Sequence, residues 1–167
     1  RGGDALGSDV QNRIAEIARN SGSYGIPATG GLCETWVEAV YRKAGVSINN
    51  ICCAGKNRSL YAVSKSSADI PIGAMVYNDP AVYHSRTTDS CQHCRQRHCQ
   101  FCKEQRTRFG DRGRFSFAPD AGHVGIYIGN GQIISNIGGT TIDTVEGWTA
   151  YYGFGGWGWG GAVVPQK

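Results

Sequence analysis

One cysteine stands where the sequence itself can activate a thiol. In GGLCETWVEAVYRKAG, Cys33 follows a Gly-Gly-Leu entry and begins a stretch whose apolar residues recur at helical spacing. The first turn of a helix presents free backbone N–H groups, and its dipole favours negative charge, which together lower the pKa of a thiol. We therefore predict that Cys33 forms a nucleophilic thiolate.

A histidine suited to act as the base begins the clearest strand pattern of the chain. In HVGIYIG, His123 and Gly125 alternate with the aliphatic Val124 and Ile126, so the two pairs are expected on opposite faces of a strand. The glycine leaves room beside the imidazole. Because imidazole titrates near neutral pH and is here fixed on a rigid element, we predict that His123 takes the proton of Cys33. A surface histidine at a strand edge is the alternative interpretation.

The residue that orients the imidazole depends on the register of the hairpin around the Asn130-Gly131 turn. A two-residue turn pairs Gly125 with Asn136 and brings Asn136 to the His123 face. A bulge at the turn glycine would bring Ser135 there instead. Since an amide oxygen is also the better acceptor for an imidazole N–H, we predict Asn136 rather than Ser135.

Helices followed by a run of strands would position these residues. Helices are expected over residues 8–20 and 33–44, with a shorter one over 59–64. Strands are expected in PIGAMVYND, in the hairpin HVGIYIGNGQIISNIGG, in TTIDTV and in WGGAVVP. This order predicts an α+β fold in one domain, residues 1–167, with a non-periodic insertion at roughly 79–120.

The ends and the tail of the chain give weaker indications. No apolar run approaches the ~20 residues of a membrane span. The chain begins at Arg1 without Met or a signal peptide, so we expect a mature product or an excised domain. The tail EGWTAYYGFGGWGWGGAVV is rich in aromatic residues that either stack on sugar rings or close the core, and we favour the core.

The blocks GGLCETWVEAVYRKAG and AGHVGIYIGNGQIISNIGG together resemble the NlpC-type and CHAP-type bacterial cell-wall cysteine peptidases. The resemblance implies a papain-like core with Cys33 as nucleophile and His123 as general base. It also implies that Tyr24, in the loop before the cysteine, lends its hydroxyl to the oxyanion site. NlpC-type enzymes carry a third polar residue, usually histidine, at the position of Ser135, whereas CHAP-type enzymes more often use an acidic residue or asparagine.

The activity that this resemblance implies is hydrolysis of an amide bond in bacterial peptidoglycan. The enzyme would be a stem-peptide endopeptidase or a muramoyl-alanine amidase that needs no cofactor for catalysis. Such domains serve in endolysins, tail or conjugation components, autolysins and toxins, so the implied location is extracellular or facing the cell wall. A transferase of the same fold, in which an amine replaces water at the acyl-enzyme, stays open.

The insertion carries most of the positive charge. The chain has a net charge of +4, and residues 86–114 hold 8 of its 17 basic residues against 3 of its 13 acidic ones. We expect either a solvated loop or a basic lip that attracts anionic wall polymers. The alternative function is a zinc-dependent module that binds nucleic acid or another polyanion here. That alternative leaves Cys33 and His123 unexplained, so nucleic acid is the less favoured partner.

Four of the seven cysteines form two CxxC pairs within CQHCRQRHCQFC. Four thiolates suit one tetrahedral zinc ion. Two disulfides in an oxidising environment, involving Cys52 or Cys53, are the alternative. We favour a structural zinc ion bound by Cys91, Cys94, Cys99 and Cys102.

Overall fold

The computed structural model describes residues 7–30, 32–51, 53–83 and 121–167. The elements in chain order are α1 (Asp9–Arg19), η1 (Ser21–Tyr24), α2 (Cys33–Lys43), α3 (Ala54–Tyr61), β1 (Ala62–Ser64), β2 (Met75–Tyr77), β3 (Val124–Gly129), β4 (Gln132–Asn136), β5 (Thr140–Thr144), α7 (Val145–Tyr151) and β6 (Gly156–Gly158). Helices together with an antiparallel sheet agree with the predicted α+β class. In the described part of the chain, no helix is long and apolar enough to cross a membrane.

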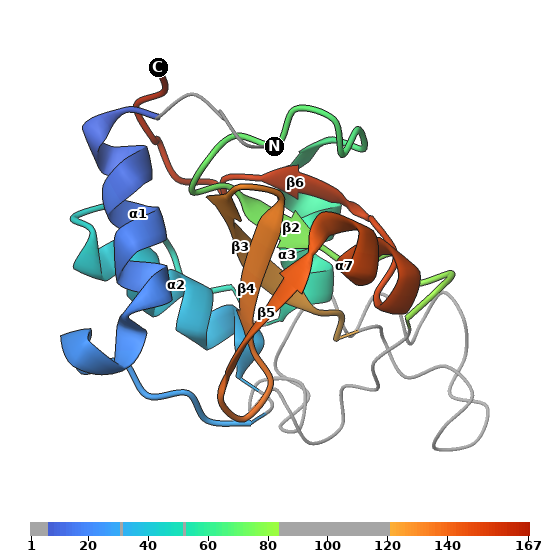
Figure 1. Ribbon diagram of the computed structural model, residues 1–167, viewed down its shortest axis with the longest axis horizontal. Coiled ribbons are helices and arrows are strands. Elements are labelled where there is room, and N and C mark those ends of the chain that lie inside the picture. Colours follow the sequence, from blue (N-terminus) through green and yellow to red (C-terminus); the bar gives the residue numbers. More distant parts are fainter. Residues whose placement is uncertain (1–6, 31, 52, 84–120) are drawn as a thin grey trace.

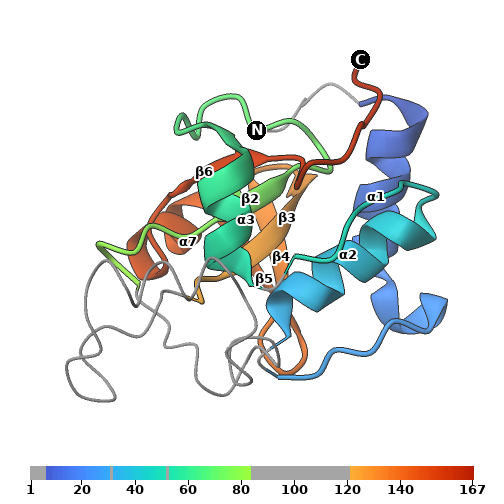
Figure 2. The ribbon, with the colours of Figure 1, turned by 180° about the vertical axis from the view of Figure 1, so that it is seen from behind.

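One six-stranded sheet joins these elements, in the order β1-β6-β2-β3-β4-β5, and every neighbouring pair of strands is antiparallel. In Figure 1, α1 and α2 stand to one side of the sheet, α3 lies behind it and α7 lies in front. Figure 2 shows the same molecule from behind, with α3 now in front. The central strands β2 and β3 are therefore covered on both faces.

Two apolar clusters occupy the two faces of the sheet. Val124 and Ile126 of β3 pack with α1 and α2 in the larger cluster. Tyr127 of the same strand packs with Ile133 and Trp148 in the smaller cluster, beneath α7. The alternation predicted for β3 is therefore confirmed, and residues at its odd-numbered positions belong to the α7 face.

Local sequence signals account for the first two helices. Ser8 and Gln11 form a reciprocal capping box at the start of α1, and both side-chain bonds are present. Helix α2 ends at Lys43 with Ala44 as its C-cap, and the following Gly45 has φ +85°, a conformation that favours glycine. Both predicted helices are confirmed. The third helix is α3, which begins earlier than expected. It also ends earlier, because residues 62–64 form strand β1 instead.

The β3–β4 hairpin turns at Asn130-Gly131 as predicted, with positive φ at both residues. Its register is different from the predicted one, because Gly125 pairs with Ser135 and not with Asn136. The register shifts between Tyr127 and Gly129, which leaves Ile128 as an extra residue in β3.

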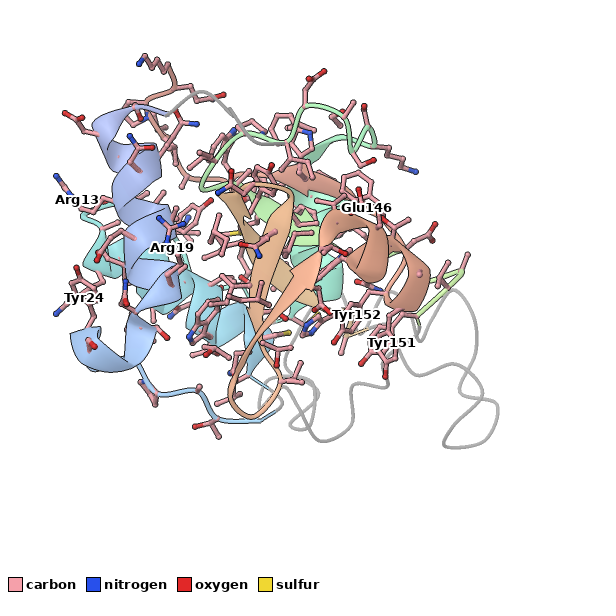
Figure 3. The ribbon with its side chains drawn as sticks, viewed as in Figure 1. Arg13, Arg19, Tyr24, Glu146, Tyr151 and Tyr152 are labelled. Atoms are coloured by element: carbon pink, nitrogen blue, oxygen red, sulfur yellow. The ribbon has the colours of Figure 1, made fainter. Side chains whose placement is uncertain are left out.

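A distant arginine stabilises this bulge. The guanidinium of Arg19, at the end of α1, donates to the carbonyl oxygen of Ile128 at 2.9 Å. Arg19 extends from α1 toward the hairpin in Figure 3. Because the bulge moves every residue of β4 by one position relative to β3, Ser135 now shares a face with His123.

The C-terminal part of the chain departs most from expectation. The segment after β5 forms helix α7, whose N-cap Thr144 accepts a hydrogen bond from the amide of Gly147. The predicted closing strand WGGAVVP is wrong, since the last strand is β6, slightly earlier. Trp148 and Tyr152 are 0% and 7% exposed, which confirms for these two residues that the aromatic tail closes the core.

Candidate active site

Cys33 is the first residue of α2, directly after the N-cap Leu32. Its side chain is half-buried and its thiol is free. The backbone amides of Val124 and Glu34 hydrogen-bond the sulfur atom. Val124 is the residue after His123, so the sulfur of Cys33 lies against the backbone at the start of β3, next to His123 in the chain.

The surroundings of Cys33 change how readily its thiol ionises. Burial raises the pKa of Cys33 to about 12, and the two backbone hydrogen bonds lower it only in part. At this position, burial therefore changes the pKa of the thiol more than the helix N-terminus does. Burial of Cys33 therefore opposes formation of the predicted thiolate in the free protein.

The backbone of His123 is fixed from two sides by Asn78. The amide of His123 donates to Oδ1 of Asn78 at 2.9 Å, and its carbonyl accepts from the amide of Asn78 at 3.0 Å. Arg58 in turn donates to the same Oδ1 at 2.8 Å. The imidazole therefore projects from a rigid point at the end of the sheet.

Ser135 contacts the imidazole directly. Its Oγ lies 2.9 Å from Nε2 of His123, and both side chains are buried. Gly125, which pairs with Ser135 across the hairpin, makes this contact feasible. A Cβ atom at Gly125 would lie only 2.7 Å from the carbonyl oxygen of Ile134 and 3.1 Å from Cβ of Ser135. With Nε2 engaged by Ser135, Nδ1 is the ring nitrogen left for proton exchange.

Aromatic rings enclose the rest of the imidazole. Tyr152 stacks on His123 with ring centroids 4.4 Å apart, Trp148 stacks at 5.3 Å, and Tyr83 approaches edge-on at 6.3 Å. This burial lowers the pKa of His123 to about 4, so the ring is neutral at pH 7. Burial also raises the pKa of Tyr152 to about 12, and the negative charge of Asp143 adds to this effect.

Asn136 acts on the nucleophile's loop and not on the imidazole. Its amide group donates to the carbonyl oxygens of Thr29 at 2.8 Å and Leu32 at 3.4 Å. Its Oδ1 accepts from the amides of Gly138 and Gly139 at 3.0 and 3.2 Å. The predicted contact between Asn136 and His123 is therefore replaced by a clamp that joins the β4–β5 turn to the segment preceding Cys33.

Tyr24 lies elsewhere. Its hydroxyl donates to the carboxylate of Glu16 on α1, and this hydrogen bond raises the pKa of Tyr24. Figure 3 shows Tyr24 beside α1, at the opposite end of the molecule from Tyr151 and Tyr152. The structure does not bring Tyr24 to Cys33, so it does not support the expected role in the oxyanion site.

A buried carboxyl network lies directly behind the nucleophile. Glu34 and Glu38, one turn apart on α2, are 4% and 3% exposed. Burial and a hydrogen bond with Glu38 raise the pKa of Glu34 well above its usual value. The Asn57 amide donates to both carboxyl oxygens of Glu34, and the Tyr77 hydroxyl donates to Asn57. The negative charge that Glu34 carries when ionised adds to burial in raising the pKa of Cys33.

Sequence reasoning missed several residues of this site. Tyr83, Trp148 and Tyr152 surround the imidazole, yet they stand far from His123 in the chain and carry no motif. Asn78 was also missed, although it ends the predicted strand PIGAMVYND. A polar residue closing a buried strand was the one signal available for it.

The predicted zinc ligands Cys91, Cys94, Cys99 and Cys102 lie outside the described residues, as does most of the predicted insertion. The zinc site therefore stays a prediction. Among the residues that are described, no group of three or more His, Cys, Asp or Glu side chains is placed to hold a metal ion.

Comparisons with known proteins add no further assignment. No family model matches the chain, and no curated protein or solved structure matches it significantly.

Proposed function

We propose that the protein is a cysteine hydrolase with a papain-like core that cleaves an amide bond of bacterial peptidoglycan. The observation that carries the chemistry is the pair of contacts at the end of β3. Ser135 engages Nε2 of His123, and the amide of Val124 donates to the sulfur of Cys33. A thiol, an imidazole and a residue orienting that imidazole are the parts that nucleophilic amide hydrolysis requires.

The substrate class rests on the resemblance of the cysteine and histidine blocks to the NlpC-type and CHAP-type peptidases. The contact of Ser135 with His123 supports that resemblance, because Ser135 occupies the position at which NlpC-type enzymes carry their third polar residue. The choice between stem-peptide endopeptidase and muramoyl-alanine amidase stays open, as does an extracellular or wall-facing location.

The reaction would begin from a neutral pair, because the pKa of Cys33 is about 12 and that of His123 is about 4. As the sulfur attacks the substrate carbonyl carbon, Nδ1 of His123 takes the thiol proton. In the tautomer that this step needs, Nε2 carries a hydrogen and donates it to Ser135. The stacked ring of Tyr152 stabilises the imidazolium that forms.

The tetrahedral oxyanion would accept a hydrogen bond from the backbone N–H of Cys33, which has no partner within the first turn of α2. The imidazolium then protonates the leaving nitrogen and the C–N bond breaks, which leaves a thioester at Cys33. Water, deprotonated by His123, attacks the thioester carbon; the C–S bond breaks, the imidazolium returns the proton to the sulfur of Cys33, and a carboxylic acid is released. Each step uses one imidazole nitrogen while Ser135 holds the other.

Digestion of purified peptidoglycan followed by mass analysis of the muropeptides tests this proposal. Wild-type protein should release fragments cut at one amide bond, and Cys33→Ala should release none. Cys53→Ala is the matched control, since Cys53 is the other cysteine without a disulfide in the described part of the chain and takes no part in the proposed reaction. Unchanged cleavage by a folded Cys33→Ala variant would refute the proposal.

A further inference from the structure

Three tyrosines continue outward from the imidazole of the proposed active site. Beyond the contacts of Tyr83 and Tyr152 with His123, Tyr151 lies 4.7 Å from Tyr152 and 6.1 Å from Tyr83, measured between ring centroids. Tyr83 and Tyr152 also contact each other, at 5.0 Å. We call Tyr83, Tyr151 and Tyr152 the tyrosine wall. Tyr151 is 67% exposed, so the wall leads from a buried base to solvent, and Figure 3 shows Tyr151 and Tyr152 together at the end of α7.

The wall is built by segments that carry only negative charge. Residues 66–83 and 121–166 contain no lysine or arginine. Asp79 pairs with the wall through its backbone, donating to the carbonyl of Tyr152 at 3.0 Å and accepting from the amide of Tyr83 at 2.9 Å. The negative charge of Asp143 adds to burial in raising the pKa of Tyr152. The faces of tyrosine rings attract cations, and the negative charge of Asp143 adds to this attraction at Tyr152.

The chemistry of the proposed mechanism determines which part of a substrate meets this wall. The imidazole of His123 must deliver its proton to the leaving nitrogen, so that nitrogen lies against the imidazole. Groups attached to it must then pass over Tyr152 and Tyr151, which extend from the same ring. By microscopic reversibility, a site that releases an amine from the acyl-enzyme is also the site from which an amine can attack it.

We propose that the tyrosine wall binds a cationic amine, and that the acyl group on Cys33 is transferred to this amine in competition with water. This activity rests on the proposed acyl-enzyme but goes beyond hydrolysis. The neutral nitrogen of the amine attacks the thioester carbon, so that a C–N bond forms and the C–S bond breaks. The proton released from nitrogen passes to His123 and then to the sulfur of Cys33. A second, remote ammonium group of the same amine lies on the ring of Tyr151.

The test supplies two amines to the wild-type protein during digestion of peptidoglycan. The first is 1,5-diaminopentane, which keeps a remote ammonium group, and the second is hexylamine, its neutral isostere, at the same free-base concentration. Mass analysis gives the ratio of amide to acid at the newly formed acyl end. This ratio is set after the acyl-enzyme has formed, so it does not depend on the rate of acylation.

We expect the diamine to give an amide-to-acid ratio about threefold to tenfold higher than hexylamine, as cation–π contacts of this kind imply. Tyr151→Leu should abolish the difference, whereas Tyr151→Phe, which keeps the ring, should preserve it. Acid alone at every amine concentration, or equal ratios for the two amines, would overturn the inference and leave hydrolysis standing. Absence of both products would overturn the proposed function and this inference together.

Discussion

The buried imidazole makes the stability of the protein depend on pH in a defined direction. Burial lowers the pKa of His123 from 6.5 to about 4. Between pH 6.5 and pH 4, the imidazole is therefore protonated in the unfolded chain but neutral in the folded protein. The free energy of unfolding contributed by this residue is therefore fully present above pH 6.5 and is lost as the pH falls toward 4.

The size of this effect follows from the two pKa values. A difference of one pKa unit corresponds to about 1.4 kcal/mol, so lowering the pH from 7.5 to 4 should remove about 3 kcal/mol through His123 alone. His123 is only 5% exposed, so solvent screens this penalty little. For a domain of this size, about 3 kcal/mol is a substantial part of the total stability.

Urea unfolding at several pH values, for the wild type and for His123→Gln, measures this contribution. Glutamine is neutral throughout the range; it also removes the ring that stacks on Tyr152 and Trp148, but that loss does not depend on pH. Glu34 has the opposite sign, since its raised pKa makes the folded state lose stability as the pH rises. Subtracting the two curves cancels Glu34 and every other shared group. Parallel curves for the two proteins between pH 7.5 and 4 would show that the imidazole is not buried as described.

Three further outcomes are expected. Ser135→Ala should lower turnover of muropeptides by about tenfold and the free energy of unfolding by about 1 kcal/mol, because it removes the hydrogen bond to the buried imidazole. Asn136→Ala should instead lower the free energy of unfolding by about 2 kcal/mol, since its four buried bonds lose their partner, and urea unfolding would reveal the opposite ranking if this is wrong. Glu34→Gln should gain stability relative to the wild type as the pH rises from 5 to 9, because the amide needs no proton to stay neutral; equal pH dependence by thermal melting would contradict this. Arg19→Met should lower turnover severalfold although Arg19 touches no candidate catalytic residue, and full turnover would show that the bulge holds without it.

Local signals predicted the parts of the fold that depend on neighbouring residues. The capping box of α1 and the glycine after α2 each act within a few positions, and both helices are found where they were expected. The Asn130-Gly131 turn is equally local, because two residues with positive φ are enough to define it. The approach of Cys33 to the strand of His123 follows from placing one residue at a helix start and the other at a strand start.

Burial is what the sequence could not supply. The helix N-terminus correctly suggested stabilisation of negative charge at Cys33, but the removal of water, which dominates its pKa, comes from packing against the sheet. The imidazole is buried by Tyr83, Trp148 and Tyr152, which reach it only after the whole domain has folded. Helix α7, which carries Trp148, was not predicted either, because it lies in a glycine-rich tail whose composition suggests loops.

The exchanged roles of Ser135 and Asn136 show how one long-range contact decides the chemistry of a site. Both residues are buried at the end of β4, and successive residues of a strand face opposite sides. The turn alone would have set Asn136 toward His123, but the extra residue in β3 shifts the register by one, and its carbonyl is held by Arg19 from 109 positions away. Ser135 then meets the imidazole, and Asn136 turns to the opposite face, where the loop before Cys33 needs donors for its carbonyls. A single shift in register therefore provides both an orienting group for the base and a clamp for the nucleophile.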